Sequence, residues 1–122
     1  MGIVGHDGQY ETEITDYSPD GGAARADAAR GALRELDGVT VTDDVDVVTV
    51  AAMRERLGVQ LELHDAGLDV GELNVIASPL QSMRDVFDLM PTETEEDWRT
   101  IGERLSRVPD RIAGYAASLR AA

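Results

Sequence analysis

The chain contains two histidines and no cysteine, so a zinc site built on imidazole or thiolate ligands would have to centre on His6 and His64. A zinc site needs three or four ligands at short, fixed spacing, and two isolated histidines do not supply one. His64 lies beside Asp65 near the end of a predicted helix, where a histidine is favourably placed on the helix dipole. A loop hydrogen bond with Asp7 explains His6. The sequence therefore predicts no metal-binding residue and no cofactor in this chain.

Two acidic runs contain paired carboxylates that could exchange protons or bind a cation: Asp43, Asp44 and Asp46, and residues 93 to 97. Both runs lie where helices are predicted to begin. Acidic side chains there interact with the positive end of the helix dipole, which explains both runs without general acid–base catalysis. Weak cation binding at the first run stays open, although it lacks the glycine and the distal glutamate of an EF-hand loop.

No serine lies in a nucleophile motif. A Gly-x-Ser-x-Gly elbow is absent, and Ser18 and Ser78 are each followed by proline, which is typical of a helix N-cap. Gly2, Gly5 and Gly8 do not follow a predicted strand and no lysine follows them, so they do not form a phosphate-binding loop. The sequence predicts no catalytic and no cofactor-binding residue.

The length and charge of the chain limit the number of domains and the kinds of partner that it can bind. The 122 residues suffice for one compact domain, so we expect residues 1–122 to form a single helical (sub)domain. The net charge is −13, with 24 acidic and 11 basic side chains, which disfavours nucleic acids and anionic membranes as partners. No stretch approaches the ~20 apolar residues of a membrane span. We expect a cytoplasmic protein.

The first half of the chain predicts an irregular N-terminal arm of about 20 residues and then two helices. Ser18 caps the first helix, which ends at about residue 37 before Gly38 and has a thin apolar stripe: Ala26, Ala29, Leu33 and Leu36. Residues 41–50 have strong strand propensity. However, apolar residues recur every three or four positions from Val47 to Leu61, which favours one helix over residues 44–66, ending at Gly67.

The second half predicts two or three helices. Ser78 and Gln81 form a capping box that starts a helix at residue 79, and Pro91 ends it. Leu73 and Ile76 continue the apolar pattern of this helix, which runs through Leu80, Met83, Phe87 and Met90. Thr92 or Thr94 begins the last segment, for which we assign Thr94 as the cap.

The last segment has the most regular pattern, a stripe at three- and four-residue spacing that is either core or an interface: Trp98, Ile101, Leu105, Val108, Ile112, Tyr115 and Leu119. Pro109 predicts a kink or break near residues 107–110. The predicted fold class is all-α, with four to five helices packed as an irregular bundle.

Three segments carry a family resemblance: TDYSPDG at 15–21, LNVIASPLQSMRDVFDLMPTETEEDW at 73–98 and RVPDRIAGYAASL at 107–119. In this order they resemble the N-terminal region of the bacterial family called domain of unknown function 885. The resemblance implies a largely helical, metallopeptidase-like protein several times longer than this chain. Its zinc motif, a His-Glu pair followed by Pro-Gly-His-His, lies far downstream and has no match here.

Two hypotheses follow. The resemblance implies a non-catalytic scaffold segment of a zinc metallopeptidase-like hydrolase, a fragment whose partner is the rest of its own longer chain. The alternative is a stand-alone acidic helical interaction module that binds another protein or associates with itself.

Overall fold

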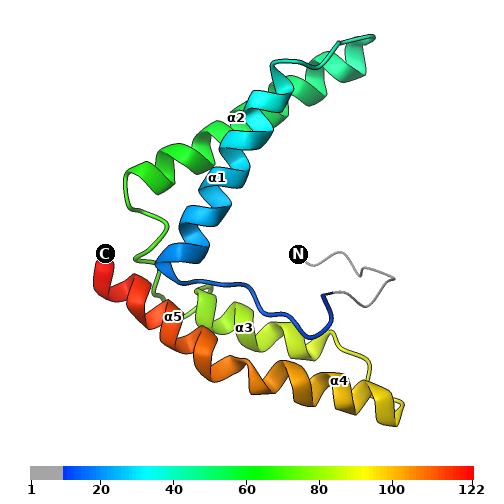
Figure 1. Ribbon diagram of the computed structural model, residues 1–122, viewed down its shortest axis with the longest axis vertical. Helices are drawn as coiled ribbons and strands as arrows, with labels where there is room; N and C mark the ends of the chain where they lie inside the picture. Colours follow the sequence, from blue (N-terminus) through cyan, green and yellow to red (C-terminus); the bar gives the residue numbers. More distant parts are fainter. Residues whose placement is uncertain (1–9) are drawn as a thin grey trace.

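The structure is a computed structural model that describes residues 10–122. Its described part is all-α, as predicted, with no strand and five helices: α1 (Pro19–Leu36), α2 (Asp44–Asp65), α3 (Pro79–Asp88), α4 (Glu95–Ser106) and α5 (Val108–Ala121). Two bodies are visible in Figure 1. The antiparallel helices α1 and α2 form a long hairpin, and it projects from a second body built of α3, α4 and α5. Helix α5 connects them because it packs against α1, α3 and α4. The predicted packing of helices is confirmed, in a more open arrangement than the word bundle suggests.

Side-chain caps define where α1 and α4 begin. The Ser18 hydroxyl oxygen accepts a hydrogen bond from the Gly21 N–H at 3.1 Å. At α4, the Thr94 hydroxyl oxygen accepts from the Asp97 N–H at 3.0 Å, and the Asp97 carboxylate accepts in return from the Thr94 N–H at 3.0 Å. Such reciprocal bonds satisfy amide groups that have no partner within the helix. The cap is therefore at Thr94 and not at Thr92.

The start of α3 is braced by Ser78 and Gln81. Gln81 Oε1 accepts from the Ser78 N–H at 3.0 Å, and the Ser78 hydroxyl also donates to this oxygen. Gln81 Nε2 donates to the carbonyl of Asn74 at 3.1 Å, so the same side chain holds the preceding loop. The Ser78 side chain is buried, which fits a structural role.

Residues 41–50 do not form a strand; the helix α2 begins within them at Asp44 and ends at a chain reversal around Gly67. Gly67 has a φ of 72°, a conformation that glycine adopts without strain. The Gly67 N–H donates to the carbonyl of His64 and the Leu68 N–H to that of Leu63, both at 2.9 Å. This pair of bonds is a Schellman motif, and it turns the chain back over the last turn of α2.

Pro109 separates α4 from α5, as predicted. Helix α4 ends at Ser106 and α5 begins at Val108, with Arg107 between them. A proline near a helix start is tolerated because its missing N–H would have no partner there. The break lets the two helices follow different directions along the same body (Figure 1).

The main core lies between the arm, α3 and α5. Ile14, Met83 and Tyr115 are its buried members, and the half-buried side chains around them are Tyr17, Phe87, Val108 and Leu119. Ile14 belongs to the irregular N-terminal arm, so the arm is part of the fold and does not merely lie on it. The predicted arm residues 1–9 lie outside the described residues.

Several apolar positions are more exposed than their pattern indicates. Leu73 and Ile76 do not continue the α3 pattern, and that prediction is wrong: their side chains are 65% and 83% exposed. Asn74 explains this, because its Oδ1 accepts from the Ile76 N–H at 2.9 Å and from the Ala77 N–H at 2.6 Å and so holds a turn in place of a helix. In α2, Val47 and Met53 are also exposed.

The long C-terminal stripe is divided between core and surface. Ile101 and Tyr115 are buried, Val108 and Leu119 are half-buried, and the remaining members are exposed: Trp98, Leu105 and Ile112.

Candidate functional site

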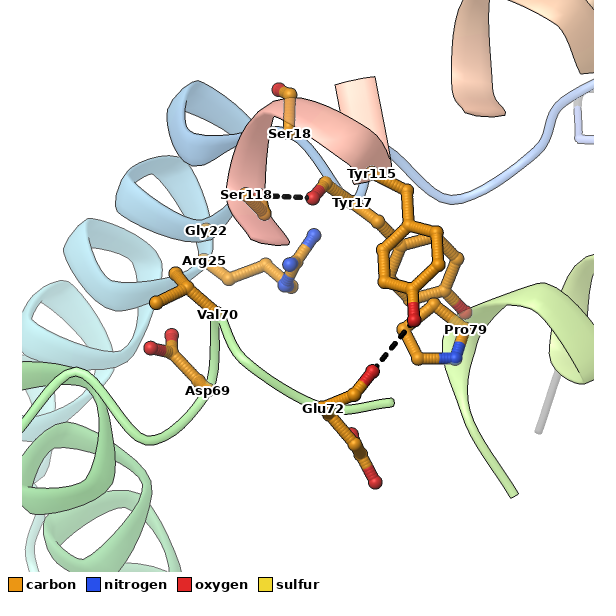
Figure 2. A pocket seen from close by; sticks show the side chains of 10 residues that line it. All are labelled: Tyr17, Ser18, Gly22, Arg25, Asp69, Val70, Glu72, Pro79, Tyr115 and Ser118. Atoms are coloured by element: carbon orange, nitrogen blue, oxygen red, sulfur yellow. Dashed lines mark hydrogen bonds between the residues drawn. The ribbon is translucent and has the colours of Figure 1, made fainter. Parts of the chain in front are cut away.

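Four segments meet where the hairpin joins the second body, and we call this place the junction: the arm at residues 16–18, the start of α1, the linker at residues 69–72, and α5. Two buried side chains of α5 tie them together (Figure 2). The Ser118 hydroxyl donates to the carbonyl of Tyr17 at 2.6 Å, and the Tyr115 hydroxyl donates to the carbonyl of Glu72 at 2.7 Å. The junction therefore fixes both the arm and the linker to α5.

Asp16 is the electrostatic centre of the junction. Its Oδ1 accepts from the Ser18 N–H at 2.9 Å, and its backbone carbonyl accepts from Arg25 Nη1 at 2.5 Å. Arg111 lies 3.6 Å from its other carboxylate oxygen. The bonds to Ser18 are the main cause that lowers the pKa of Asp16 from its ordinary value of 3.8. Burial opposes them, and the charges of Arg111 and Arg25 lower the pKa by smaller amounts.

Two glycines permit the close approach of these segments. A Cβ at Gly21 would collide with the carbonyl oxygen of Asp16 and lie 2.9 Å from its carbonyl carbon. A Cβ at Gly114 would lie 3.0 Å from Cβ of Ser18, which brings α5 against the start of α1. Any side chain at Gly21 must therefore move the backbone of the arm.

The cavity at the junction has a volume of about 20 Å³. This is room for about one water molecule. Ten residues line it (Figure 2), and the Arg25 guanidinium lies over the ring of Tyr17, 5.9 Å from its centroid. Because the cavity cannot hold a substrate, the junction is a structural joint.

A larger space, which we call the α1–α2 groove, runs along the hairpin beside the junction. Its volume is about 410 Å³, and its lining residues are Gly22, Arg25, Ala26, Glu55, Arg56, Val59, Gln60, Leu63, His64 and Asp69. His64 Nδ1 lies 2.6 Å from Asp69 Oδ2 at the end of the groove near the linker.

The partner of His64 differs from the neighbour that the sequence suggests. His64 is in the last turn of α2, as predicted, but Asp65 pairs with Arg30 of α1 at 3.1 Å, and the partner of His64 is Asp69. Sequence reasoning missed Asp69 because the contact depends on the chain reversal. The available signal was Gly67, since a C-terminal Schellman motif brings the following residues back over the helix end.

The chemistry of the α1–α2 groove is limited by its lining residues. An aspartate–histidine pair activates a nucleophile when a hydroxyl or thiol lies beside the imidazole, and the lining residues include neither. Within residues 10–122, no three His, Cys, Asp or Glu side chains are grouped so that they could hold a metal ion, so these residues do not fit zinc. His6 lies outside the described residues. Among the described residues, the groove therefore presents apolar and charged side chains without a hydroxyl or thiol nucleophile.

Three arginines hold the arm against α4 and α5. Arg104 Nη2 donates to the carbonyl of Tyr10 at 2.7 Å, and both Arg107 and Arg111 pair with the carboxylate of Glu13. Sequence reasoning missed the role of these arginines. Their spacing of three and four residues was the signal for a shared face.

Comparison with known protein families identifies the family of this chain. A family model described as "Bacterial protein of unknown function (DUF885)" matches residues 1–122, the whole chain. The chain belongs to the bacterial DUF885 family. Comparison with curated proteins gives no match. In the part of this DUF885 chain that the structure describes, no helix has both the length and the apolar character needed to cross a membrane.

Proposed function

We propose that this DUF885 chain is the non-catalytic N-terminal scaffold segment of a longer, zinc metallopeptidase-like hydrolase. It holds a rigid helical frame against the rest of that protein and contributes a wall of the substrate cleft. The chemistry that the resemblance implies belongs to a zinc motif outside these residues. The partner in this proposal is therefore the remainder of the longer chain, which we call the hydrolase body.

The observation that carries the proposal is an apolar surface on the linker between α2 and α3. We call it the linker patch, and its members are the exposed side chains Leu68, Leu73, Val75 and Ile76. Val75 is 92% exposed. The exposure of several large apolar side chains on one short linker favours this segment as a place where another protein surface packs.

The linker patch is exposed on a firmly held segment. Tyr115 holds the carbonyl of Glu72, and Gln81 holds the carbonyl of Asn74, so the backbone on either side of Leu73 is anchored to α5 and α3. A surface that is already ordered loses little conformational entropy on docking. This fits a preformed contact with the hydrolase body.

Zinc analysis and a peptidase assay test the catalytic part of the proposal. The isolated chain is expected to contain no tightly bound zinc and to show no activity, while the longer protein shows both. One equivalent of zinc held by the isolated chain through dialysis against a chelator would overturn it.

The docking part is tested by substitution in the longer protein. Val75→Glu places a charge in the linker patch and is expected to reduce activity and thermal stability, because a charge buried in an apolar contact is unfavourable. Leu89→Glu is the matched control, since Leu89 is 88% exposed in the turn after α3. Equal effects of the two substitutions would contradict docking through the linker patch.

A second candidate function is an independent acidic interaction module. It is favoured by the exposed members of the C-terminal stripe, Trp98, Leu105 and Ile112, which are spaced seven residues apart. Sedimentation at increasing concentration distinguishes the two. Self-association that Leu105→Glu abolishes supports this candidate, and a monomer at all concentrations counts against it.

A further inference from the structure

The α1–α2 groove has the size and the lining of a small-molecule site. Its volume of about 410 Å³ lies within the range of about 300–1,000 Å³ that is usual for ligand pockets. Ala26, Val59 and Leu63 provide apolar surface, and they come from both helices of the hairpin. An extended aliphatic group would replace water on this surface.

The groove contains two arginines that form no ion pair within the described residues of an acidic protein. Neither Arg25 nor Arg56 has a carboxylate within 4.0 Å among the described residues, although the chain carries 24 acidic side chains. Arg25 is held in place, because one nitrogen donates to the carbonyl of Asp16 and the guanidinium lies over Tyr17. A guanidinium is suited to a carboxylate because it can donate two parallel hydrogen bonds.

Two acidic residues also line the groove, but neither forms an ion pair with these arginines. Asp69 is engaged with His64 at 2.6 Å. Glu55 precedes Arg56 in α2, and no carboxylate of the described residues lies within 4.0 Å of either guanidinium.

Gly22 leaves space in the groove that a side chain at this position would occupy. A Cβ built at Gly22 would lie 3.9 Å from Asp69 Oδ2, 4.0 Å from Arg25 Nη2 and 4.0 Å from His64 Cε1. Three polar groups thus converge on this point from α1, α2 and the linker.

We propose that the α1–α2 groove binds an aliphatic carboxylate. The apolar chain lies over Val59, Leu63 and Ala26, and the carboxylate accepts hydrogen bonds from Arg25 and Arg56. The ligand is either a free aliphatic acid or an acidic side chain on an apolar peptide. This site does not depend on the proposed scaffold function, because the linker patch is a separate surface.

The test is an NMR titration of the isotopically labelled chain with octanoate, with octanol and octylammonium as controls. Saturable shifts of the amides around Gly22, Val59 and Leu63 are expected with octanoate, with at least tenfold weaker binding of both controls. Equal binding of the three compounds, or the absence of saturable shifts at these amides, overturns the proposal. A parallel titration with acetyl-Leu-Leu-Glu-amide identifies the source: saturable binding of either carboxylate supports the site, and the tighter one is the closer analogue.

Variants locate the site. Arg56→Gln is expected to weaken octanoate binding about tenfold, as the loss of one charged hydrogen bond implies. Arg34→Gln is the matched control, since Arg34 lies on α1, has no carboxylate partner among the described residues and does not line the groove. Gly22→Ala partly fills the convergence point and is expected to weaken binding at least threefold without loss of helical signal. Unchanged binding by Arg56→Gln, or equal loss with Arg34→Gln, overturns the assignment.

Discussion

Substituting the adjacent glycines Gly21 and Gly22 by alanine should change stability in opposite directions. Both are buried in the first turns of α1. An alanine Cβ at Gly21 would collide with the backbone of Asp16, which Arg25 and Ser18 hold in place. Overpacking costs about 1–3 kcal/mol, and loss of the charged hydrogen bond from Arg25 adds to it, so we expect about 2–4 kcal/mol of destabilisation.

At Gly22 the same methyl group meets only ordinary contacts of 3.9–4.0 Å. Alanine is favoured over glycine in a helix by up to about 1 kcal/mol, so Gly22→Ala should stabilise the chain slightly. For 122 residues, 1 kcal/mol corresponds to about 4 °C in the melting temperature. We therefore expect a decrease of about 8–16 °C for Gly21→Ala and an increase of up to about 4 °C for Gly22→Ala.

Thermal and urea unfolding followed by circular dichroism measure both effects. Gly114→Ala is a useful third variant, because its Cβ would lie 3.0 Å from a side-chain atom of Ser18, which can shift more easily than backbone. An intermediate loss is expected. Equal effects of Gly21→Ala and Gly22→Ala would show that the arm does not pack on α1 as described, and would refute the reasoning.

Three further predictions concern the junction. The pKa of Asp16 is lowered in the folded chain, so ionised Asp16 contributes to the free energy of unfolding above the unfolded pKa of about 3.9, and this contribution is lost as the pH falls below that value. Asp16→Asn should therefore reduce the stability of the chain at pH 7 and make stability fall less steeply in acid. Urea unfolding measured between pH 2.5 and 7 tests both effects. Ser118→Ala leaves the buried carbonyl of Tyr17 without its donor and should cost about 1–3 kcal/mol in urea unfolding, whereas a change below 0.5 kcal/mol would speak against the bond. Tyr115→Phe removes one hydrogen bond but keeps the ring in the core, so we expect a smaller loss of about 1 kcal/mol, together with faster amide hydrogen exchange in the linker.

The helix boundaries were predictable because they depend on local chemistry. Ser18 and Ser78, each followed by proline, and the Thr94 capping position all act within three residues of themselves, so a sequence pattern contains the whole interaction. Pro109 likewise breaks the last segment through its own missing N–H. The choice of helix over strand at residues 44–50 was also correct, and the N-cap explains it better than the apolar period, because the Asp43 carboxylate accepts from the Asp46 N–H at 2.8 Å while α2 buries no side chain.

The contacts between helices were not predictable in the same way. The partner of His64 is Asp69 and not its neighbour Asp65, because the reversal at Gly67 decides which carboxylate reaches the imidazole. The exposure of Leu73 and Ile76 also escaped the sequence pattern. A period identifies apolar positions, but it does not show which neighbour covers them, and here no described residue covers these two side chains.

Hydrogen exchange of the linker patch tests the scaffold proposal most directly. Amide exchange at residues 68–76 should be measured by mass spectrometry in the isolated chain and in the longer protein to which the scaffold proposal assigns it. The proposal predicts that these amides exchange at least tenfold more slowly in the longer protein, while those at the hairpin tip around Val39 change less. Equal exchange of the linker in both proteins would contradict the scaffold role.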